Sequence, residues 1–441
     1  MASGRLADYL GKGLASARPA TLTLHPEAVG FWYATDTGVL STWDGAAWHD
    51  VTSAGGIQSI VPGTGISIDA SDPANPVVSA TGSSGGGSSI IGSLAKWTAA
   101  KARGAANPAR LAIIGDSNVA GYGSASGTGG LTGAVSTSLA RRFLTKKGIR
   151  SDCFFGDQNI ASTPVSLPVY DPRITLGAGW APDGTDSQIF GGRHIKGAAT
   201  PSGRLRFSPS GPLNRFRVWY PTLTGLNQQV GVYIDGTLAD TINQDSAASL
   251  ASKDYVVASG THYIEFGATG AGDSFITGVE TFDGTATPVA LVGGYCGCRA
   301  VDLAASAQPW NHDPMVKTIK PDFTIVICTI NDTTASTDPG AWYTNMEKVV
   351  KGAAATSDGC LCVGFVPNNN AALGGIYSYD SKMLALRSLA ADYGWHFFDL
   401  RSAVGGSWAR ENDRGLAYDN LHPNATGAEA IADALDAFLA L

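Results

Sequence analysis

The sequence predicts an α/β domain with a parallel β-sheet covered by helices on both faces, interrupted by an inserted antiparallel β-sandwich and preceded by a small β-rich segment. Three observations carry this prediction. After residue 90, continuous apolar strands alternate with helical stretches, the pattern of a parallel sheet buried on both faces. Between residues 200 and 285 the strands are short and alternating, with turn signals between them. The Gly/Ser-rich stretch 81–89 is typical of a flexible linker.

Composition and charge narrow the class of protein. A chain of 441 residues is expected to hold two or three domains. Apolar residues make up 44% of the chain, which excludes wholesale disorder. Charged residues make up only 15% and glycines number 56, which favours a β-rich, turn-rich extracellular or particle-borne protein. The net charge is −7 and no Lys/Arg run stands out, so no nucleic-acid partner is expected.

No membrane or export segment is predicted. The most apolar stretch, 323–330, is far too short to span a bilayer, so no membrane insertion is expected. Residues 1–20 contain no continuous apolar core, so we expect no secretory signal peptide.

Two Cys-x-Cys pairs, Cys296/Cys298 and Cys360/Cys362, would place both thiols of each pair on one face of a strand. Such pairs can indicate a metal site. No nearby histidine completes a persuasive ligand set, and both pairs lie in apolar, strand-like stretches. We therefore favour buried free thiols, with zinc as the alternative. The prediction is that the protein uses no metal and no cofactor.

Residues 1–80 hold short strand-like runs punctuated by Gly, Asp and Pro. The sequence Trp43-Asp44-Gly45 is typical of a hairpin turn between aromatic strands. Strands this short build little core by themselves. The segment is therefore expected to need a partner chain or a neighbouring domain.

The α/β domain is expected in two parts, 90–199 and 286–441. Its predicted strands and helices cover 111–114, 134–145, 323–330, 342–354, 381–393 and 426–441, with further apolar strands before the last two helices. The segment 200–285 is predicted to be a sandwich inserted between the two parts, which is tolerated when the ends of the interrupted loop lie close together.

Four aromatic residues of the predicted sandwich, Trp219, Tyr220, Tyr233 and Tyr255, allow two interpretations. Exposed aromatic rings stack on sugars, which would make the sandwich a carbohydrate-binding domain. The same residues can instead pack the core of the sandwich. The sequence leaves both possibilities open.

Ser117 is the candidate nucleophile. The apolar strand 111–114 runs directly into Gly115-Asp116-Ser117-Asn118, and a helix is expected to follow. A serine at the carboxyl end of a parallel strand lies in the crevice where α/β sheets bind ligands. The N–H groups at the start of the helix can stabilise a developing oxyanion.

A serine needs a base to become nucleophilic, and His422 is the histidine that stands out. Asp419 precedes it by three residues, just before the C-terminal helix. An Asp and a His at this spacing can face the same way. The carboxylate can then hold the imidazole in the tautomer that leaves the other ring nitrogen free for the proton of Ser117.

Each of these signals has a purely structural interpretation. Ser117 could be only a helix cap, and Asn331-Asp332 could be a cap or an Asx-turn after a strand. Gly297 could mark a bulge. The triplet also occurs twice, because Gly272-Asp273-Ser274 repeats it inside the predicted sandwich without a preceding apolar strand, and there we interpret it as a turn. Chain order, spacing and context together favour a hydrolase.

These residues resemble the SGNH (GDSL-like) esterase and lipase superfamily, in which four blocks supply Ser, Gly, Asn and His in that order. The matching blocks are the strand ending in Ser117, the stretch LVGGYCGCRAVDL, the strand ending in Asn331 and Asp419-x-x-His422. The resemblance covers about 107–200 and 286–441 and implies a flavodoxin-like, three-layer α/β/α hydrolase domain. Where the family usually has glycine in its third block, this chain has Thr329.

The resemblance implies the roles of the residues. Ser117 attacks an ester carbonyl, His422 is the base and then the acid, and Asp419 orients it. The oxyanion hole would consist of the N–H groups of Ser117 and Gly297 and the side-chain amide of Asn331. Gly294 is the alternative to Gly297.

Asp116 and Asp332 are expected to tie loops together rather than to do chemistry.

Residues 1–80 also resemble repeats of bacteriophage tail fibres and spikes, and the interrupted esterase resembles tail-borne deacetylases. This implies a homotrimer that is assembled in the host cytoplasm, joins other virion tail proteins through its N-terminal segment and acts at the bacterial cell surface. Its partner would be a bacterial surface polysaccharide, from which it removes O-acetyl groups. A catalytically silent adhesin on the same fold and a general esterase or lipase are the alternatives.

Overall fold

The computed structural model describes residues 9–20, 30–37, 39–43, 46–50, 66–69, 77–80, 89–159, 165–184, 188–199, 202–225, 227–327, 330–335, 337–363, 379–400 and 408–441. The chain forms two compact units, Met1–Gly86 (unit 1) and Gly87–Leu441 (unit 2). The boundary falls inside the predicted linker 81–89. Of that linker only residue 89 is among the described residues.

Unit 1 contains a four-stranded sheet in the order β1-β2-β3-β4 and a separate pair, β5-β6. Strand β1 is parallel to β2, and the other neighbours are antiparallel. Its elements are β1 (Tyr9–Gly13), η1 (Ala15–Ala17), β2 (Gly30–Ala34), β3 (Val39–Trp43), β4 (Trp48–Asp50), β5 (Ile66–Asp69) and β6 (Val77–Ala80). Strands β3 and β4 flank the predicted hairpin turn, whose residues 44 and 45 lie outside the described residues.

The described part of unit 1 buries few apolar side chains, namely those of Trp32, Ala34 and Trp43. A polar cluster supports the sheet, because Arg18 donates to the side chains of both Ser41 and Asp50. The expectation that this segment builds little core of its own is consistent with this small set. Whether a partner chain completes it stays a prediction.

Unit 2 is built on a five-stranded parallel sheet in the order β20-β7-β21-β22-β23. The strands are β7 (Arg110–Gly115), β20 (Val289–Val292), β21 (Phe323–Ile327), β22 (Asp358–Val363) and β23 (His396–Asp399). Numbered along the chain, this is the order 2-1-3-4-5 of flavodoxin-like sheets. The predicted α/β class with a parallel sheet is confirmed.

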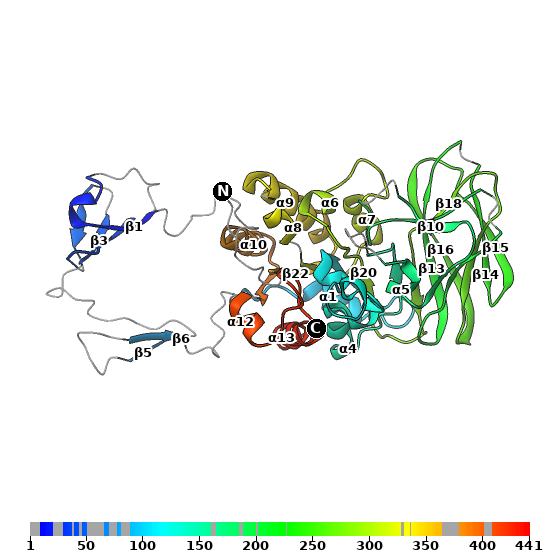
Figure 1. Cartoon of the computed structure of the whole chain (residues 1–441), viewed down its shortest axis with the longest axis horizontal. Helices are drawn as coiled ribbons and strands as arrows, with labels where there is room; N and C mark the ends of the chain where they lie inside the picture. Colours follow the sequence, from blue (N-terminus) through cyan, green and yellow to red (C-terminus); the bar gives the residue numbers. More distant parts are fainter. Residues whose placement is uncertain are drawn as a thin grey trace. The chain divides into compact units, whose positions relative to one another are not determined.

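Helices cover both faces of the parallel sheet (Figure 1). Helices α1, α4 and α13 share one buried apolar cluster with the sheet, and α6, α7, α9 and α10 share the other. The helices of unit 2 are α1 (Ala95–Lys101), α2 (Ser117–Ala120), η3 (Thr128–Gly130), α3 (Ala134–Thr137), α4 (Leu139–Lys146), α5 (Leu167–Tyr170), α6 (Ala300–Leu303), α7 (His312–Ile319), α8 (Ile330–Thr334), α9 (Pro339–Ala354), α10 (Tyr379–Tyr393), α12 (Trp408–Asp413) and α13 (Ala425–Phe438).

The alternation of side chains along β7 explains the two layers. Leu111 and Ile113 point into one cluster, and Ala112 and Ile114 point into the other. Successive side chains of a strand face opposite sides of the sheet, so a continuous apolar run satisfies both layers.

Antiparallel sheets form the other end of unit 2, drawn in green in Figure 1. Their orders are β15-β14-β17-β12-β9, β16-β13-β19-β8 and β10-β11-β18. The strands are β8 (Phe154–Phe155), β9 (Ile174–Leu176), β10 (Trp180–Pro182), β11 (Ile195–Gly197), β12 (Leu205–Phe207), β13 (Leu213–Thr222), β14 (Gln229–Ile234), β15 (Thr237–Asn243), β16 (Ser249–Gly260), β17 (Ile264–Ala268), β18 (Ser274–Ile276) and β19 (Gly278–Phe282).

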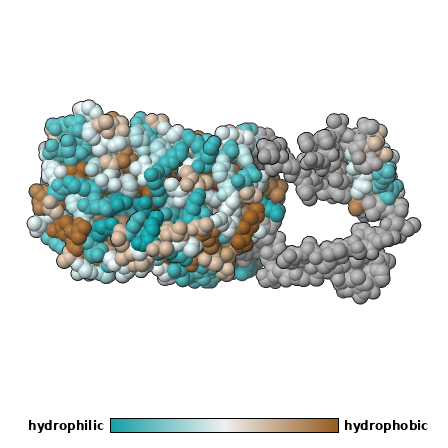
Figure 2. All heavy atoms as spheres, turned by 180° about the vertical axis from the view of Figure 1, so that it is seen from behind, coloured by the Kyte–Doolittle hydropathy of each residue, from teal (hydrophilic) through white to brown (hydrophobic). Residues whose placement is uncertain are grey.

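The antiparallel region begins earlier than the predicted boundary at residue 200. Strands β8, β9 and β11 lie before that residue and pair with strands from the predicted insertion, and β10 pairs with β11. Two of the sheets share a core, since Phe216 and Val218 of β13 are buried together with Val230 and Val232 of β14. On the face of unit 2 in Figure 2, apolar residues form separate patches among hydrophilic ones.

Candidate active site

Ser117 lies where β7 ends and α2 begins. Strand β7 passes so close to β21 that a Cβ on Gly115 would lie 1.9 Å from the carbonyl oxygen of Ile327, so no larger residue fits there. Asp116 caps α2, and its carboxylate accepts hydrogen bonds from both the backbone N–H and the side-chain amide of Asn118. This turn places Ser117 at the carboxyl end of β7, between β20 and β21 in the sheet.

His422 and Asp419 lie in a tight loop before α13. The Asp419 carboxylate accepts hydrogen bonds from the N–H groups of Leu421 and His422, at 2.7 and 2.8 Å. Both of its oxygens are 3.0 Å from Nδ1 of His422. Burial alone would raise the pKa of Asp419, but the hydrogen bond and charge of His422 and these N–H groups outweigh burial and lower it.

The structure brings Ser117 and His422 together although 305 residues separate them, with Oγ 2.8 Å from Nε2. A carboxylate only accepts hydrogen bonds, so Nδ1 of His422 carries the proton that bonds to Asp419. Nε2 is then the acceptor for the Ser117 hydroxyl. Both Ser117 and His422 are less than 10% exposed. The three side chains can therefore move a proton from Ser117 to His422.

Asn331 and Asp332, in α8 at the end of β21, both bind the segment that follows β20. The Asn331 amide donates to the carbonyl of Cys298 at 2.8 Å. The N–H of Ala300 donates to Asp332 at 2.8 Å. One N–H of the Asn331 amide is used in this way, and the amide has a second that can serve as an oxyanion donor.

Asp332 is a buried carboxyl with a supporting role. Burial raises its pKa, and the hydrogen bonds from Ala300 and Thr337 and the positive charge of Lys382 oppose that rise. Burial in turn lowers the pKa of Lys382. Asp332 lies against the loop rather than beside Ser117, as its hydrogen bond to Ala300 shows.

The two glycines considered for the oxyanion hole differ in exposure. Gly297 is exposed, and it adjoins Cys298, whose carbonyl Asn331 holds. Gly294 is buried, and a Cβ there would lie 2.4 Å from the side chain of Val119 in α2. This geometry favours Gly297 as the donor. The position of Thr329 lies outside the described residues.

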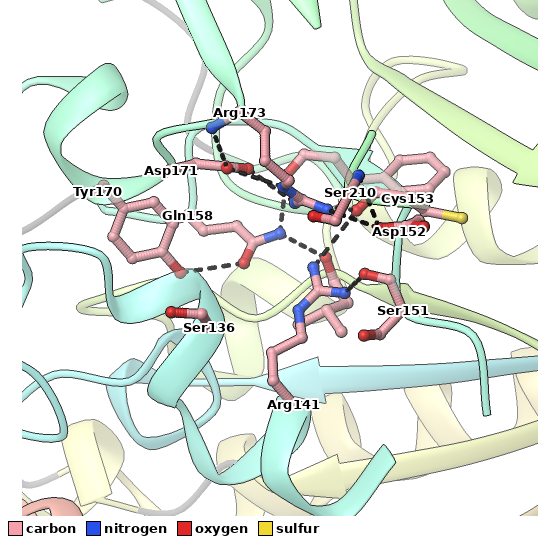
Figure 3. Close-up of polar contacts among 12 residues, drawn as sticks. Ser136, Arg141, Ser151, Asp152, Cys153, Gln158, Tyr170, Asp171, Arg173 and Ser210 are labelled. Carbon is pink, nitrogen blue, oxygen red and sulfur yellow. Dashed lines mark hydrogen bonds and ion pairs between the residues drawn. The ribbon is translucent and has the colours of Figure 1, made fainter. Parts of the chain in front are cut away.

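A buried polar network supports the serine helix and the glycine loop (Figure 3). The Tyr170 hydroxyl donates to the carbonyl of Ala120, the last residue of α2, and also contacts Oε1 of Gln158 at 3.1 Å. Gln158 in turn donates to the carbonyl of Val292 at 2.6 Å and accepts from the N–H of Cys296. The backbone of Gln158 has a left-handed φ of +49°, a strained conformation for a residue other than glycine.

Arg141 from α4 lies beside this network (Figure 3). Its guanidinium donates to the carbonyls of Ser151 and Cys153. Burial, together with the charge of Arg173, lowers its pKa to about 10. These bonds hold α4 to the first antiparallel strand, and so connect the two parts of unit 2.

Tyr122 lies beside His422, and Tyr418 lies beside Tyr122. The ring of Tyr122 lies 4.3 Å from the imidazole of His422, tilted by 34°. The ring of Tyr418 meets Tyr122 edge-on at 6.1 Å. Sequence reasoning missed both tyrosines and also Gln158 and Tyr170. Only Tyr122 carried a visible signal, as an aromatic residue between two glycines directly after the Ser117 helix.

The cysteine pairs are buried thiols in the described structure. Cys296, Cys298, Cys360 and Cys362 are all buried. Burial raises the pKa of Cys296 and of Cys360. Within the described ranges, no group of three or more His, Cys, Asp or Glu side chains could hold a metal ion. No helix in the same ranges is long and apolar enough to cross a membrane.

Comparisons with known proteins agree with this fold. Residues 271–430 match the model of the GDSL-like Lipase/Acylhydrolase family. The matched range contains Gly297, Asn331, Asp419 and His422, and it begins after Ser117. A comparison with curated proteins found no match.

Among solved structures, one described as "Peptidoglycan O-acetylesterase in action, 5 min" has a TM-score of 0.56 and 15% identity, covering 78% of this chain and 93% of that chain. A family two carbohydrate esterase from Clostridium thermocellum in complex with cellohexaose has a TM-score of 0.25 and 12% identity, with coverages of 60% and 97%. Axe2, an acetylxylan esterase from Geobacillus stearothermophilus, has a TM-score of 0.27 and 19% identity, with coverages of 34% and 70%. The first of these shares the fold.

Proposed function

We propose that the protein is a serine esterase of the SGNH/GDSL-like type, because residues 271–430 match the GDSL-like Lipase/Acylhydrolase family model. Ser117 is its nucleophile, His422 its general base and acid, and Asp419 the residue that orients His422. One observation carries this proposal: Oγ of Ser117 lies 2.8 Å from Nε2 of His422, while both Asp419 oxygens lie 3.0 Å from Nδ1. A helix cap alone would not require this chain of contacts.

The reaction follows from these contacts. Oγ of Ser117 attacks the ester carbonyl carbon while Nε2 of His422 takes the hydroxyl proton. The tetrahedral intermediate collapses, the bond to the alcohol oxygen breaks, and His422 gives its proton to that oxygen. Water then attacks the acyl-serine while His422 takes a proton from it. The bond between the acyl carbon and Oγ breaks, His422 gives that proton to Oγ of Ser117, and the acid leaves.

The oxyanion of the intermediate would be bound by N–H donors from α2, from the loop after β20 and from α8. Those of Ser117 and Gly297 come from the backbone, and Asn331 supplies its side-chain amide. The hydrogen bond from Asn331 to the Cys298 carbonyl holds the loop of Gly297 against α8 before substrate arrives. Such preorganised donors contribute most of the stabilisation in acyl transfer.

The substrate class follows from resemblance rather than from the site alone. We propose that the ester is an O-acetyl group on a bacterial surface polysaccharide. The sequence resembles tail-borne deacetylases, and the α/β domain shares its fold with a structure described as a peptidoglycan O-acetylesterase. The runner-up substrate is a simple ester without a sugar.

The first experiment measures p-nitrophenyl acetate hydrolysis near neutral pH. We expect steady turnover in the wild type and its loss in Ser117→Ala and His422→Ala. His262→Ala is a matched control, because His262 also pairs with an aspartate, Asp235, at 2.6 Å, but in the antiparallel region. This control should keep the wild-type rate. Turnover that survives in Ser117→Ala would contradict the proposed nucleophile.

The second experiment measures acetate release from O-acetylated bacterial polysaccharides. The wild type should release acetate and leave the length of the polysaccharide unchanged, whereas Ser117→Ala should release none. An enzyme that hydrolyses p-nitrophenyl acetate but releases no acetate from any O-acetylated polysaccharide would contradict the substrate class and leave the esterase chemistry standing.

We propose further that unit 1 attaches the chain to a phage tail and forms a homotrimer with other copies. The small apolar core of its described part supports an interface that supplies more burial. Sedimentation of the full chain should give three times the 45.4 kDa chain mass. A monomer in this measurement would contradict the trimer. Antibody against the chain should label the tails of virions, and labelling absent from virions would contradict the location.

A further inference from the structure

Tyr418 is an exposed aromatic side chain beside the general base. Its side chain is 44% exposed, and among the described residues of unit 2 no other Phe, Trp or Tyr is counted among the exposed large side chains. Tyr418 precedes Asp419 directly in the catalytic loop. Burying an aromatic side chain stabilises a fold, and Tyr418 forgoes most of that stabilisation by facing solvent.

The loop holds Tyr418 rigidly. Its backbone N–H donates to the carbonyl of His422 at 2.9 Å, and the flanking Ala417 and Pro423 form a bridge. A Cβ on Gly123 would lie 2.8 Å from the Cβ of Tyr418, so a larger residue at position 123 would displace it. One edge of the ring meets Tyr122. The backbone of Tyr418 and one side of its ring are therefore held by the protein itself, and such preorganisation lowers the entropic cost of binding.

The reaction fixes which part of an ester lies here. His422 gives its proton to the alcohol oxygen as the ester bond breaks, so the alcohol must lie on the side of His422. The acyl oxygen must instead face Ser117, Gly297 and Asn331. Tyr122 packs against the imidazole of His422, and Tyr418 packs against Tyr122. Both rings are therefore on the side of the site that holds His422, which the alcohol oxygen must also approach.

We propose that Tyr418, supported by Tyr122, is a subsite for the sugar ring that carries the ester, which it binds by stacking against the C–H face of the ring. This inference rests on the proposed esterase function. A pyranose offers an apolar C–H face, which suits a flat aromatic side chain, and its hydroxyls can bond to the tyrosine O–H at the edge. A rigid ring placed there would orient the ester oxygen toward His422.

The aromatic residues of the antiparallel region are less suited to this role. Trp219 and Tyr220 are buried. Tyr255 stacks on Phe216 with centroids 4.9 Å apart. One face of Tyr233 is covered by the guanidinium of Arg204 at 3.5 Å. The described structure thus favours the core interpretation for Trp219, Tyr220 and Tyr255. Tyr233 is half-buried beneath Arg204, and the exposed ring of unit 2 is that of Tyr418.

The test compares two esters that differ in the alcohol. The probes are methyl 6-O-acetyl-glucopyranoside, which has a sugar ring, and ethyl acetate, which has none. Tyr418→Ala should lower kcat/KM for the sugar ester about tenfold, mainly through KM, and change the rate with ethyl acetate less than about twofold. Tyr418→Phe should keep most of the wild-type value, because the ring remains.

Tyr33→Ala is the matched control, since Tyr33 is a tyrosine of nearly equal exposure, 45%, in unit 1. It should leave both esters unaffected. An equal loss on both esters in Tyr418→Ala would show a damaged catalytic loop and overturn the subsite, as would no loss on either. If the wild type hydrolyses p-nitrophenyl acetate but neither of these esters, the subsite is overturned. If it hydrolyses none of the three, the proposed function itself fails.

A binding measurement makes the subsite testable without turnover. In Ser117→Ala, saturation-transfer NMR with methyl glucopyranoside should show contact of the protein with the ring C–H protons. The double variant Ser117→Ala/Tyr418→Ala should lose that signal, and a signal that persists unchanged would overturn the proposal.

Discussion

Two Gly-Asp-Ser triplets in this chain, residues 115–117 and 272–274, occupy different structures. The first ends a parallel strand and opens a helix, and its serine contacts His422. The second opens the short antiparallel strand β18, and Ser274 is fully buried with its hydroxyl donating to the carbonyl of Gln229 at 2.8 Å. The same three letters thus give a serine paired with a histidine in one context and a buried serine that anchors a strand in the other.

The aspartates differ in the same way. Asp116 is fully buried and caps α2. Asp273 is half-exposed and pairs with Lys196 at 2.5 Å. The family match begins at residue 271, so its range includes the second triplet and excludes the first. The sequence Gly-Asp-Ser alone does not identify a candidate active site. The strand that precedes the triplet and the partner of the serine hydroxyl distinguish the two copies.

The largest expected contrast between the triplets is covalent. A fluorophosphonate that traps activated serines should modify Ser117 and leave Ser274 unmodified, because only Ser117 contacts a histidine base. Mass spectrometry of proteolytic peptides locates the adduct. Ser117→Ala should abolish labelling, and Ser274→Ala should keep it. An adduct on Ser274 would reverse the assignment of the two triplets.

Asp419→Asn should give the next largest effect, a fall of about 10⁴-fold in kcat, because an amide leaves His422 in the wrong tautomer. Asp273→Asn is the control from the other triplet and should keep the wild-type kcat. Steady-state kinetics on p-nitrophenyl acetate measures both. A fall of less than about tenfold in Asp419→Asn would contradict its orienting role.

The same variant has a signature in stability against pH. The folded-state pKa of Asp419 lies below its ordinary value of 3.8, since His422 and two N–H groups outweigh burial. Its ionised form therefore stabilises the fold above that value, and this contribution is lost as the pH falls through the lowered pKa. The stability difference between wild type and Asp419→Asn should be constant above about pH 4 and shrink below it in denaturant titrations.

Asn331→Ala should lower kcat about 10²- to 10³-fold with little change in KM, because an oxyanion donor acts in the transition state. Asn243→Ala, an exposed asparagine in β15, is the control and should change neither constant. An unchanged kcat in Asn331→Ala would leave Asn331 as a loop anchor only, through its bond to Cys298.

Sequence reasoning reached the parallel sheet and the candidate residues Ser117, Asn331, Asp419 and His422, because strand–turn–helix context and local spacing are written in neighbouring residues. It placed one helix over 134–145, but Ser138 has an extended ψ of 152° and caps a second helix through the N–H of Arg141, so α3 and α4 are separate. Short polar residues favour such caps over helix interiors.

The start of the antiparallel region and the support of the site could not be predicted in this way. Strand β8 consists of only Phe154 and Phe155, and its pairing with β19 joins residues more than one hundred positions apart. The role of Gln158 likewise depends on Tyr170, Val292 and Cys296 meeting in three dimensions. Such contacts leave no periodic pattern in a single sequence.

Tyr170→Phe tests whether the first triplet depends on that support. Removing the hydroxyl leaves the carbonyl of Ala120 and the side chain of Gln158 without a buried donor, which should cost about 1–3 kcal/mol of unfolding free energy. We also expect kcat to fall severalfold as α2 loosens. Tyr255→Phe is the control, because its hydroxyl bonds to the half-buried Asp240, and it should leave kcat unchanged. If the unfolding free energy falls by the expected amount and kcat does not change, the network stabilises the fold and has no effect on catalysis.

The smallest expected effect separates the two aspartates. Asp116→Ala removes a helix cap and should cost about 0.5–2 kcal/mol of unfolding free energy, with a lower kcat because Ser117 is the first residue of that helix. Asp273→Ala removes an ion pair at the surface, worth about 0–1 kcal/mol, and the N–H of Ala199 that it releases lies at an exposed residue where water can replace it. Urea denaturation and p-nitrophenyl acetate kinetics on both variants measure the contrast. If Asp273→Ala lowered kcat as much as Asp116→Ala, the second triplet would also affect catalysis. The contrast between residues 115–117 and residues 272–274 would then be wrong.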